Sequence, residues 1–297
     1  MRFCLSGASG FLGTALGAHL REQGHEVVRL VRRPARGPFE VRWNPAEGEL
    51  DHEVIDDADV VVNLSGAPIA HWPWTPSYRR TLLQSRTAPT RTLAEAIARS
   101  PQPPALLSGS GINAYGDDRG DTLLTEGTPR GRGFLADVVE QWEAAAAPAQ
   151  QAGTRVCFLR TSPVLDSSGG LLRVIALPFR VGLGGRLGSG DQYFPVVSLR
   201  DWLGAVTFLA ENDNASGPYN LVAPEPATNA DFTRALASAL RRPAVVPVPS
   251  FGLRLALGGL SAMALGSLRA VPGRLEEAGH TFADKDVQDV VTTALGR

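Results

Sequence analysis

RFCLSGASGFLG, residues 2–13, is the stretch that decides the fold of this chain. Its apolar residues 3–5 form the short run that is typical of a buried parallel strand. Three glycines follow at once, and the pattern over residues 14–21 is helical. A strand, a glycine turn and a helix in this order predict the phosphate-binding corner of a dinucleotide-binding fold.

Each glycine of this corner has its own task in such a fold. Gly7 permits the tight turn, Gly10 lets a pyrophosphate approach the backbone, and Gly13 lets the helix pack against the strand. The diphosphate would then lie on unpaired N–H groups at the positive end of the helix. An ordinary turn is the alternative. The expected cofactor contacts in the corner are Gly7, Ser9, Gly10, Phe11, Leu12 and Gly13.

The residues after the second strand indicate which dinucleotide is bound. This strand is expected over residues 26–30, and its end should lie beside the adenosine ribose. An acidic residue at that point would favour NAD, but the chain has Arg32 and Arg33. Because cations suit a 2′-phosphate, the sequence favours NADP(H). The alternative is that both arginines are solvated side chains on a loop.

Strand and helix patterns alternate along the rest of the chain. This alternation predicts an α/β fold with a Rossmann-type, doubly wound parallel sheet. We expect a dinucleotide-binding domain over residues 1–163, to which residues 199–215 return, and a smaller, mainly helical substrate lobe over residues 164–297. Further strands are expected at residues 40–43, 59–64, 105–108, 154–159 and 219–222, and further helices at residues 77–100, 134–151 and 201–211.

The turn after the strand at residues 59–64 is a second candidate for cofactor contact. Ligands of open α/β sheets bind outside the carboxyl ends of the strands. The small residues Ser65, Gly66 and Ala67 follow that end directly. We therefore expect this turn to pass under the cofactor.

Composition excludes several classes of partner and site. The net charge of −1 over 297 residues gives no electrostatic reason to expect nucleic acid or an anionic membrane. Cys4 and Cys157 lie in apolar runs, so buried reduced thiols of a cytoplasmic protein are expected, not a disulfide. The apolar residues 255–268 are too few to cross a bilayer comfortably and predict a buried helix. No signal peptide is expected before the first strand, and the spacing of the five histidines predicts no metal site.

Motifs along almost the whole chain resemble those of a known family. They are GASGFLG, VNLSGAPI, SRTAPT, LTE, FLADVVEQWEAAA, RTSPVL, GLGGRLGSG, YNLVAPEPATNADF, RRPAVVPVPS and RAVPGRLEEAGHTF. The chain is similar to the extended, atypical short-chain dehydrogenase/reductases of the sugar-nucleotide-epimerase-like branch. The resemblance implies a nicotinamide cofactor, a small-molecule substrate and an active site between the Rossmann domain and the C-terminal lobe. The serines Ser108 and Ser110 at the end of the fifth strand also carry the resemblance. Arg86 and Pro163, which belong to these motifs, and Ser108 are further expected cofactor contacts.

The acid–base pair that the resemblance implies is missing. Enzymes of this superfamily use a Ser or Thr, a Tyr, and a Lys four residues after the Tyr to move the substrate proton. Ser110 supplies the serine, but Phe134 and Val138 stand at the expected positions of the pair. In the other possible register these are Leu135 and Val139. None of these side chains can transfer a proton.

Other residues could replace the pair. Tyr115 follows Ser110 on the loop after the fifth strand, and Glu126 lies on the next loop, where relatives often carry a substrate-side acid. Tyr193 and Asp201 are weaker candidates. Each has a structural alternative: Tyr115 could pack under the nicotinamide, Glu126 could cap the following turn, and Asp201 could cap its own helix.

Two functions stay open. One is an NADP(H)-dependent oxidoreductase or epimerase-like enzyme that acts on a small hydroxyl, carbonyl or nucleotide-sugar-like substrate. The other is a catalytically silent NADP(H)-binding sensor or partner-binding module, which the missing pair suggests. The glycine-rich loop at residues 182–190 is expected on the substrate side and favours an enzyme. Trp72 and Trp74 could line a substrate pocket or pack in the core. The sequence does not predict the oligomeric state.

Overall fold

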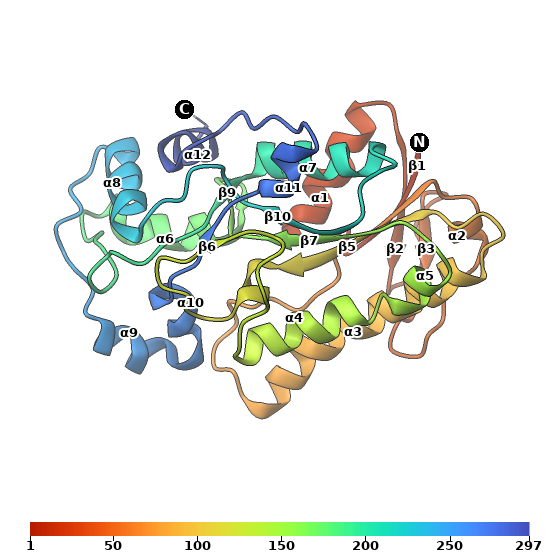
Figure 1. Cartoon of the computed structure of the whole chain (residues 1–297), viewed down its shortest axis with the longest axis horizontal. Coiled ribbons are helices and arrows are strands. Elements are labelled where there is room, and N and C mark those ends of the chain that lie inside the picture. The colour runs from red at the N-terminus through yellow and green to blue at the C-terminus, as the bar shows by residue number, and fades with distance from the viewer. Residues whose placement is uncertain (297) are drawn as a thin grey trace.

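A seven-stranded, wholly parallel sheet forms the centre of the computed structural model (Figure 1). The structure describes residues 1–296, except for the side chains of Arg254, Ala256 and Leu257. In spatial order the strands are β10 (Gly217–Leu221), β7 (Val156–Thr161), β5 (Ala105–Gly111), β4 (Val60–Asn63), β1 (Arg2–Ser6), β2 (Glu26–Val31) and β3 (Glu40–Arg42). The sheet confirms the predicted doubly wound α/β fold.

Helices cover both faces of the sheet because its strands are apolar on both sides. Phe3 and Leu5 of β1 belong to the core on one face, and Cys4 between them belongs to the core on the other. This is the two-residue period of a strand. The first face packs against α1 (Phe11–Glu22) and α7 (Leu199–Glu211), and the second against α2 (Glu53–Asp56), α3 (Pro76–Arg99) and α5 (Ala147–Gln151), so that three layers result (Figure 1).

The stretch expected to return to the sheet packs on it. Trp202, Val206 and Leu209 of α7 are buried in the same core as Phe3. The chain then adds β10 at the edge of the sheet, in register with β7. The domain boundary at residue 163 is not tested by this packing and stays a prediction.

The remainder of the chain is mainly helical, as expected. Leu172, Phe179, Phe232, Leu236 and Val290 share a separate core. The elements of this region are β8 (Val164–Asp166), α6 (Gly170–Arg180), β9 (Val197–Ser198), α8 (Asn229–Leu240), α9 (Ser250–Leu257), α10 (Ser261–Leu265), β11 (Arg269–Ala270), α11 (Gly273–Glu277) and α12 (Val287–Ala294), with β11 paired to β6 (Leu123–Leu124).

Two predicted helices are wrong in detail. The helix expected over residues 134–151 is divided into α4 (Phe134–Ala144) and α5, because the chain turns at Ala145 and Ala146 before α5 begins at Ala147, with Pro148 in its first turn. Residues 255–268 do not form one buried helix. The backbone of Gly258 is left-handed at φ 50° and ends α9, and Leu255 is 85% exposed. Among residues 1–296, no helix has the length and apolar character needed to cross a membrane.

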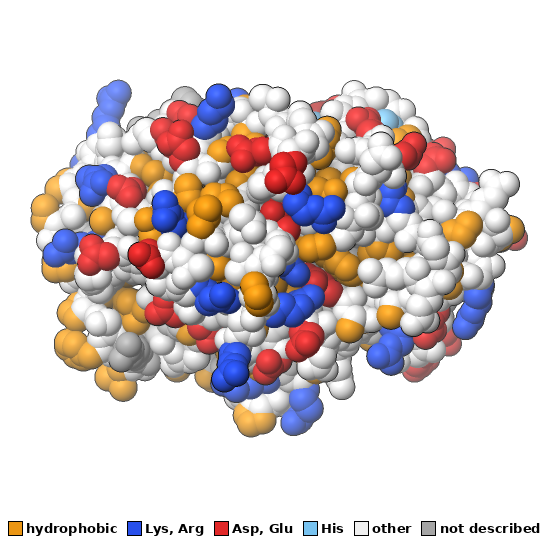
Figure 2. All heavy atoms as spheres, viewed as in Figure 1, with side chains coloured by type: hydrophobic (Ala, Val, Ile, Leu, Met, Phe, Trp, Pro, Cys, Tyr) orange, Lys and Arg blue, Asp and Glu red, His pale blue; other side chains and the backbone are white. Residues whose placement is uncertain are grey.

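Both cysteines are buried and free, as predicted. Burial raises the pKa of the Cys4 thiol to about 12 and that of Cys157 to about 11. Neither thiol is therefore a nucleophile at neutral pH. On the visible surface, basic and acidic side chains are interspersed (Figure 2), in keeping with the net charge of −1.

Candidate functional site

The chain turns from β1 into α1 at the glycine corner, residues 7–13. Gly7 has a φ of 70°, and a Cβ there would lie 2.5 Å from the carbonyl carbon of Leu64. A Cβ on Gly13 would lie 2.3 Å from the carbonyl oxygen of Gly7. A Cβ on Gly10 would meet only that same oxygen, at 3.3 Å. The fold itself therefore requires glycine at positions 7 and 13, whereas the space beside Gly10 is open to a ligand.

The amino end of α1 is open and electropositive. Gly10 is its N-cap, no side chain caps it, and its first turn carries no acidic residue. The first N–H groups of a helix have no acceptor within the helix, so those of Phe11 and Leu12 are available to an anion. The corner lies where the strand order reverses between β1 and β4, the position at which open sheets bind ligands. These features fit a dinucleotide diphosphate.

The other predicted contacts of the glycine corner differ in burial and in the residues that they touch. Ser9 is exposed, and Leu12 packs partly against the main core. The Phe11 ring lies against the start of α6, because a Cβ on Gly169 would be 2.5 Å from it. Phe11 thus joins the corner to the C-terminal region.

Arg32 and Arg33, which the sequence predicted as a pair of cofactor contacts, have different partners in the structure. The Arg33 guanidinium donates to both carboxylate oxygens of Glu40, at 2.7 and 2.8 Å. Arg29 and the backbone N–H of Arg36 donate to the same carboxylate. The hydrogen bonds from Arg33 lower the pKa of Glu40 to about 2. Arg32 is exposed and has no hydrogen bond or ion pair with the described residues, so its charge is free to meet a phosphate.

The turn after β4 is held from both sides. Ser65 donates from its hydroxyl to Ser6 at 3.0 Å and from its backbone to Asn63 at 3.1 Å. The backbone N–H of Ala67 donates to the Ser85 hydroxyl of α3 at 2.9 Å. The turn therefore has a fixed shape next to the glycine corner.

Arg86 of α3 lies beneath this turn. Its guanidinium donates to the carbonyl oxygens of Leu82, at 3.0 Å, and Ala67, at 3.1 Å. A Cβ on Gly66 would lie 3.1 Å from its central carbon, and the Trp142 ring lies 5.2 Å away. The residue is 7% exposed.

Ser110 belongs to a buried polar network. Its hydroxyl donates to Glu143 of α4 at 2.6 Å. Arg160 of β7 donates to both oxygens of the same carboxylate, at 3.0 and 3.2 Å, and Arg130 also contacts it. Burial alone would raise the pKa of Glu143, but hydrogen bonds and charge from Arg160 outweigh it, so the pKa lies below its usual range. The carboxylate is therefore ionised and fixes the direction of the Ser110 O–H bond.

The same network reaches Tyr115 and Glu126. Arg160 donates to the Tyr115 hydroxyl at 3.2 Å, and this hydroxyl donates to the side chain of Asn220 at 2.8 Å. The backbone N–H of Asn220 donates to Glu126 at 3.0 Å. All three predicted catalytic residues thus lie in one chain of hydrogen bonds.

Burial raises the pKa values of Tyr115 and Glu126. Tyr115 is wholly buried, and its burial raises the pKa of the phenol despite the nearby Arg160 charge. Glu126 is 7% exposed, and burial raises its pKa although backbone N–H groups of Asn220 and Arg274 donate to it. Through these two hydrogen bonds Glu126 connects β10 to α11.

The other predicted residues lie near the carboxyl edge or outside it. Ser108 is buried within β5, and its hydroxyl donates to the carbonyl of Gly109. Pro163 follows β7, and its carbonyl accepts from Val197. The Tyr193 ring packs beneath the Arg269 guanidinium at 5.2 Å. The cap of α7 is Ser198, so the expected capping by Asp201 is wrong; Asp201 lies in the first turn and accepts from the backbone of the C-terminal segment.

Comparisons with known proteins agree with this geometry. A family model described as the NAD dependent epimerase/dehydratase family matches residues 3–222. A second, described as a domain of unknown function, DUF1731, matches residues 248–294. The first match covers well over half of the chain.

The chain belongs to the NAD-dependent epimerase/dehydratase family.

Relatives of this epimerase/dehydratase family match the chain from end to end. Epimerase family protein Mb2239 of Mycobacterium bovis is 40% identical over 295 residues, which cover 99% of this chain and 97% of the relative. Epimerase family protein SDR39U1 of Bos taurus is 38% identical over 289 residues, covering 95% and 96%. The crystal structure of human SDR39U1 with NADPH superposes at a TM-score of 0.91, with 33% identity and 100% coverage of both chains. UDP-N-acetylglucosamine 4-epimerase from Bacillus cereus, at 14% identity and a TM-score of 0.77, shares the fold.

The usual tyrosine and lysine of the superfamily are replaced by apolar side chains that pack. Leu135, Val138 and Val139 of α4 are buried. The Phe134 ring lies 5.5 Å from that of Trp74 and 4.9 Å from the Arg79 guanidinium. Trp72 is 55% exposed, and Trp74 is partly buried, so neither tryptophan is in the core. Their predicted place in a substrate pocket is not tested by these contacts.

Glu143, Arg160 and Asn220 are the network residues that sequence reasoning missed. A signal was present, because charged residues are rarely buried without partners. Arg160 ends the apolar run VCFLR, and Glu143 precedes four alanines. The pattern could not show that the two meet, since α4 and β7 come together only through tertiary packing.

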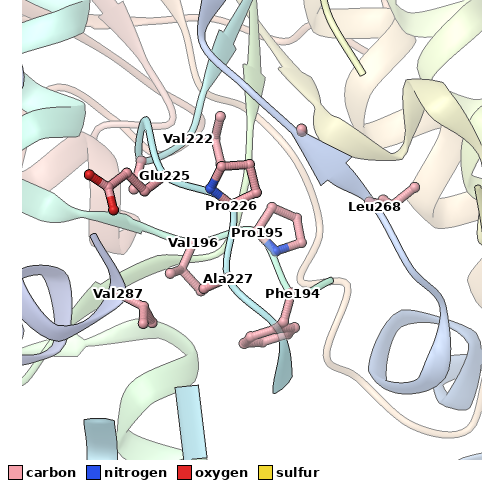
Figure 3. Close-up of a pocket in the computed structure, with 11 residues that line it drawn as sticks. Phe194, Pro195, Val196, Val222, Glu225, Pro226, Ala227, Leu268 and Val287 are labelled. Atoms are coloured by element: carbon pink, nitrogen blue, oxygen red, sulfur yellow. The ribbon is translucent and has the colours of Figure 1, made fainter. Parts of the chain in front are cut away.

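A small pocket lies within the C-terminal region, away from the glycine corner. Its lining includes Phe194, Val222, Glu225 and Leu268 (Figure 3). It encloses about 10 Å³, which is about the room for one water molecule. It is therefore too small for a substrate. Within the described part of the chain, no group of three His, Cys, Asp or Glu residues could hold a metal ion.

Proposed function

We propose that this protein is an NADP(H)-dependent oxidoreductase or epimerase-like enzyme. The observation that carries the proposal is the open, electropositive amino end of α1 behind a glycine corner shaped for a diphosphate. We assign cofactor contact to this corner, to the turn at residues 65–67 and to Ser108 and Pro163.

The choice of NADP(H) over NAD(H) has two supports. Human SDR39U1, which is similar along the whole chain, was crystallised with NADPH. In this chain, the exposed guanidinium of Arg32, which has no partner among the described residues, follows β2, where a 2′-phosphate would lie. Arg33, bound to Glu40, would support the loop.

The cofactor would supply or accept a hydride beside the ends of β4 and β5. Ser110 has its O–H bond committed to Glu143, so toward a ligand its oxygen offers lone pairs. It would therefore accept a hydrogen bond from a substrate hydroxyl. We assign substrate contact to Ser110, with Glu143 and Arg160 as positioning residues.

Tyr115 and Glu126 would act from further along the network. The Tyr115 phenol keeps its proton at neutral pH because burial raises its pKa. It would hold Arg160 and Asn220 in place through its two hydrogen bonds. Glu126 would hold β10 beside Tyr115 and Arg160, because it accepts a hydrogen bond from the Asn220 backbone. The substrate we propose is a small hydroxyl or carbonyl compound, acted on in the cytoplasm.

Titration of the purified protein with NADPH and with NADH tests the cofactor proposal. We expect a fluorescence change with NADPH and a dissociation constant at least tenfold lower than for NADH, a difference of about 1.4 kcal/mol. Equal affinities would contradict NADP(H) selection, and no binding of either coenzyme would contradict the whole proposal. Turnover is then measured by NADPH oxidation with a panel of carbonyls, enones and nucleotide sugars.

A silent NADP(H)-binding sensor is the second candidate. The observation in its favour is that the positions of the missing acid–base pair carry buried apolar side chains, including Val138. The two functions separate in one comparison. Cofactor turnover with any member of the panel supports the enzyme, whereas a partner bound according to the oxidation state of the coenzyme, without turnover, supports the sensor.

A further inference from the structure

Large apolar side chains are exposed together on one face of the C-terminal region. This surface, the α6–α9 face, is defined by six side chains that are between 62% and 85% exposed: Val174, Leu177, Val181, Leu183, Phe251 and Leu255. Hydrophobic side chains are concentrated over α9, at the lower left of the visible face (Figure 2). Single exposed apolar residues are common, but a contiguous group marks an interaction surface.

Backbone contacts join the two halves of the α6–α9 face. The N–H group of Val246 donates to the carbonyl oxygen of Gly184 at 3.3 Å, and that of Val248 donates to Arg186 at 2.9 Å. Leu187 and Val248 form a parallel β-bridge. The segment that follows α6 therefore runs beside the segment that precedes α9, so the apolar side chains of both belong to one surface.

The helix α6 is apolar on both sides. Leu172 and Phe179 face inward and belong to the core of the C-terminal region. Val174, Leu177 and Val181 recur at intervals of three and four residues and are exposed, so they form a second stripe on the outer side. A helix that is hydrophobic all round is normally covered all round. We therefore expect a partner to cover the outer stripe.

The charge around this face is wholly positive. Residues 167–190 and 241–275 contain no Asp or Glu. The arginines of these segments that are exposed and form no ion pair with the described residues are Arg173, Arg180, Arg186, Arg241 and Arg242. The net charge of −1, from which no anionic membrane was expected, is an average over the whole chain and does not show this local excess. The partner should therefore be both apolar and negatively charged.

A second copy of the chain fits this face poorly, because a symmetric dimer would place the face against itself. The arginines of both copies would then meet, and like charges in contact oppose association. A folded protein would need a surface complementary to side chains that project outward. A lipid surface accepts projecting apolar side chains without such a match and supplies negative charge.

We propose that the α6–α9 face docks on the surface of an anionic membrane. The apolar side chains enter the boundary between the headgroups and the acyl chains, and the arginines meet the lipid phosphates. The protein lies on the bilayer and does not cross it. This inference does not depend on the proposed function, because no residue of the face is assigned to the cofactor or the substrate.

Co-sedimentation with lipid vesicles tests the proposal. Wild type is mixed with vesicles of phosphatidylcholine alone, and with vesicles that contain phosphatidylcholine and phosphatidylglycerol in equal parts. At low salt we expect binding to the anionic vesicles to be about tenfold stronger or more, since several arginines contribute. Added salt should weaken this binding progressively, because it screens the attraction between arginines and lipid phosphates.

Two variants separate the apolar part of the contact from the charged part. Phe251→Asp removes an apolar side chain and adds a charge that the lipids repel, so it should weaken binding to anionic vesicles by about tenfold or more. Arg180→Gln should weaken it by about fivefold, the effect of one surface cation. Leu123→Asp on β6 and Arg91→Gln on α3 are the matched controls at exposed sites outside the face, and both should bind like wild type.

Equal binding to neutral and anionic vesicles, or no binding to either, overturns the proposal. So does a Phe251→Asp variant with wild-type vesicle affinity. Without vesicle binding, a dimer in sedimentation velocity that Phe251→Asp abolishes would assign the face to a second copy, and binding of soluble polyglutamate would assign it to an acidic protein. Thermal unfolding shows whether each variant is folded. If Phe251→Asp is not, equal vesicle affinities of Arg180→Gln and Arg91→Gln overturn the proposal.

Discussion

At the scale of single residues, Arg32 and Arg33 are adjacent but have different partners. Arg33 is held by Glu40, whereas Arg32 has no partner among the described residues. Arg32→Ala should therefore weaken NADPH binding by about tenfold or more, the effect of losing a charged hydrogen bond, and leave NADH binding unchanged. Fluorescence titration with both coenzymes measures this.

Arg33→Ala is the companion variant. It should weaken NADPH binding less than Arg32→Ala, because its guanidinium already donates to Glu40. A larger loss in Arg33→Ala would show that Arg33 leaves Glu40 to bind the phosphate.

His280 predicts a pH dependence of stability. Its Nε2 is buried without a hydrogen-bond partner among the described residues, and its ring packs between Phe208 and Phe282. Burial lowers the pKa of His280, although Asp201 partly opposes it. The unfolded chain, with a pKa of about 6.5, therefore takes up the proton first. The contribution of His280 to stability is complete above that pH and is lost as pH falls below it.

Urea unfolding of wild type and His280→Phe between pH 7 and pH 5 measures this contribution, over a range set by the unfolded pKa of about 6.5. The variant should lose less stability across the range. His52→Gln, an exposed site, is the control. Parallel curves for wild type and His280→Phe would contradict the prediction.

At the scale of elements, we expect Gly13 and Gly10 of the glycine corner to have different roles. Gly13 is needed for the packing of α1, and Gly10 for the binding of the cofactor. A Cβ on Gly13 would lie 2.3 Å from the Gly7 oxygen and 2.8 Å from the Ala8 Cα, so α1 must move. Gly13→Ala should destabilise the protein by about 1–3 kcal/mol, the usual cost of overpacking. Gly10→Ala should change stability less but abolish NADPH binding, since its Cβ would occupy the diphosphate position.

Thermal unfolding and NADPH titration of both variants check this pair. Unchanged stability of Gly13→Ala would contradict the packing argument. Wild-type NADPH affinity in Gly10→Ala would contradict the position of the diphosphate.

The elements also show why the sequence predicted the fold better than the site. The corner and the buried strands are local patterns, so spacing and apolar runs are sufficient to predict them. The ion pair between Glu40 and Arg33 depends on the pairing of β2 with β3. The hydrogen bond from Ser110 to Glu143 depends on how α4 packs on β5. The segment at residues 255–268 was predicted from composition, which does not show the turn at Gly258.

At the scale of the whole molecule, Asp201 ties α7 to the C-terminal segment. Its carboxylate accepts from the backbone N–H groups of Ala283, at 2.9 Å, and Asp284, at 2.8 Å. Asp201→Ala should destabilise the protein by about 1.5–3 kcal/mol, as expected for loss of a charged hydrogen-bond acceptor.

Hydrogen exchange locates this effect. Asp201→Ala should increase exchange in α12, which follows the released segment, and the exposed Asp213→Ala should not. Unchanged exchange in α12 would show that other contacts hold the C-terminal segment.

The late position of β10 in the chain has a consequence for synthesis on the ribosome. Until residues 217–221 emerge, β7 remains an outer strand whose free backbone groups could pair with a neighbouring nascent chain. Tyr115 and Glu126 also lack their shared partner until Asn220 arrives. A polypeptide truncated before β10 would therefore expose the edge of β7 and lack the hydrogen bonds that join Tyr115 and Glu126 to Asn220. Such a product would be prone to aggregation and would contain only part of the candidate site.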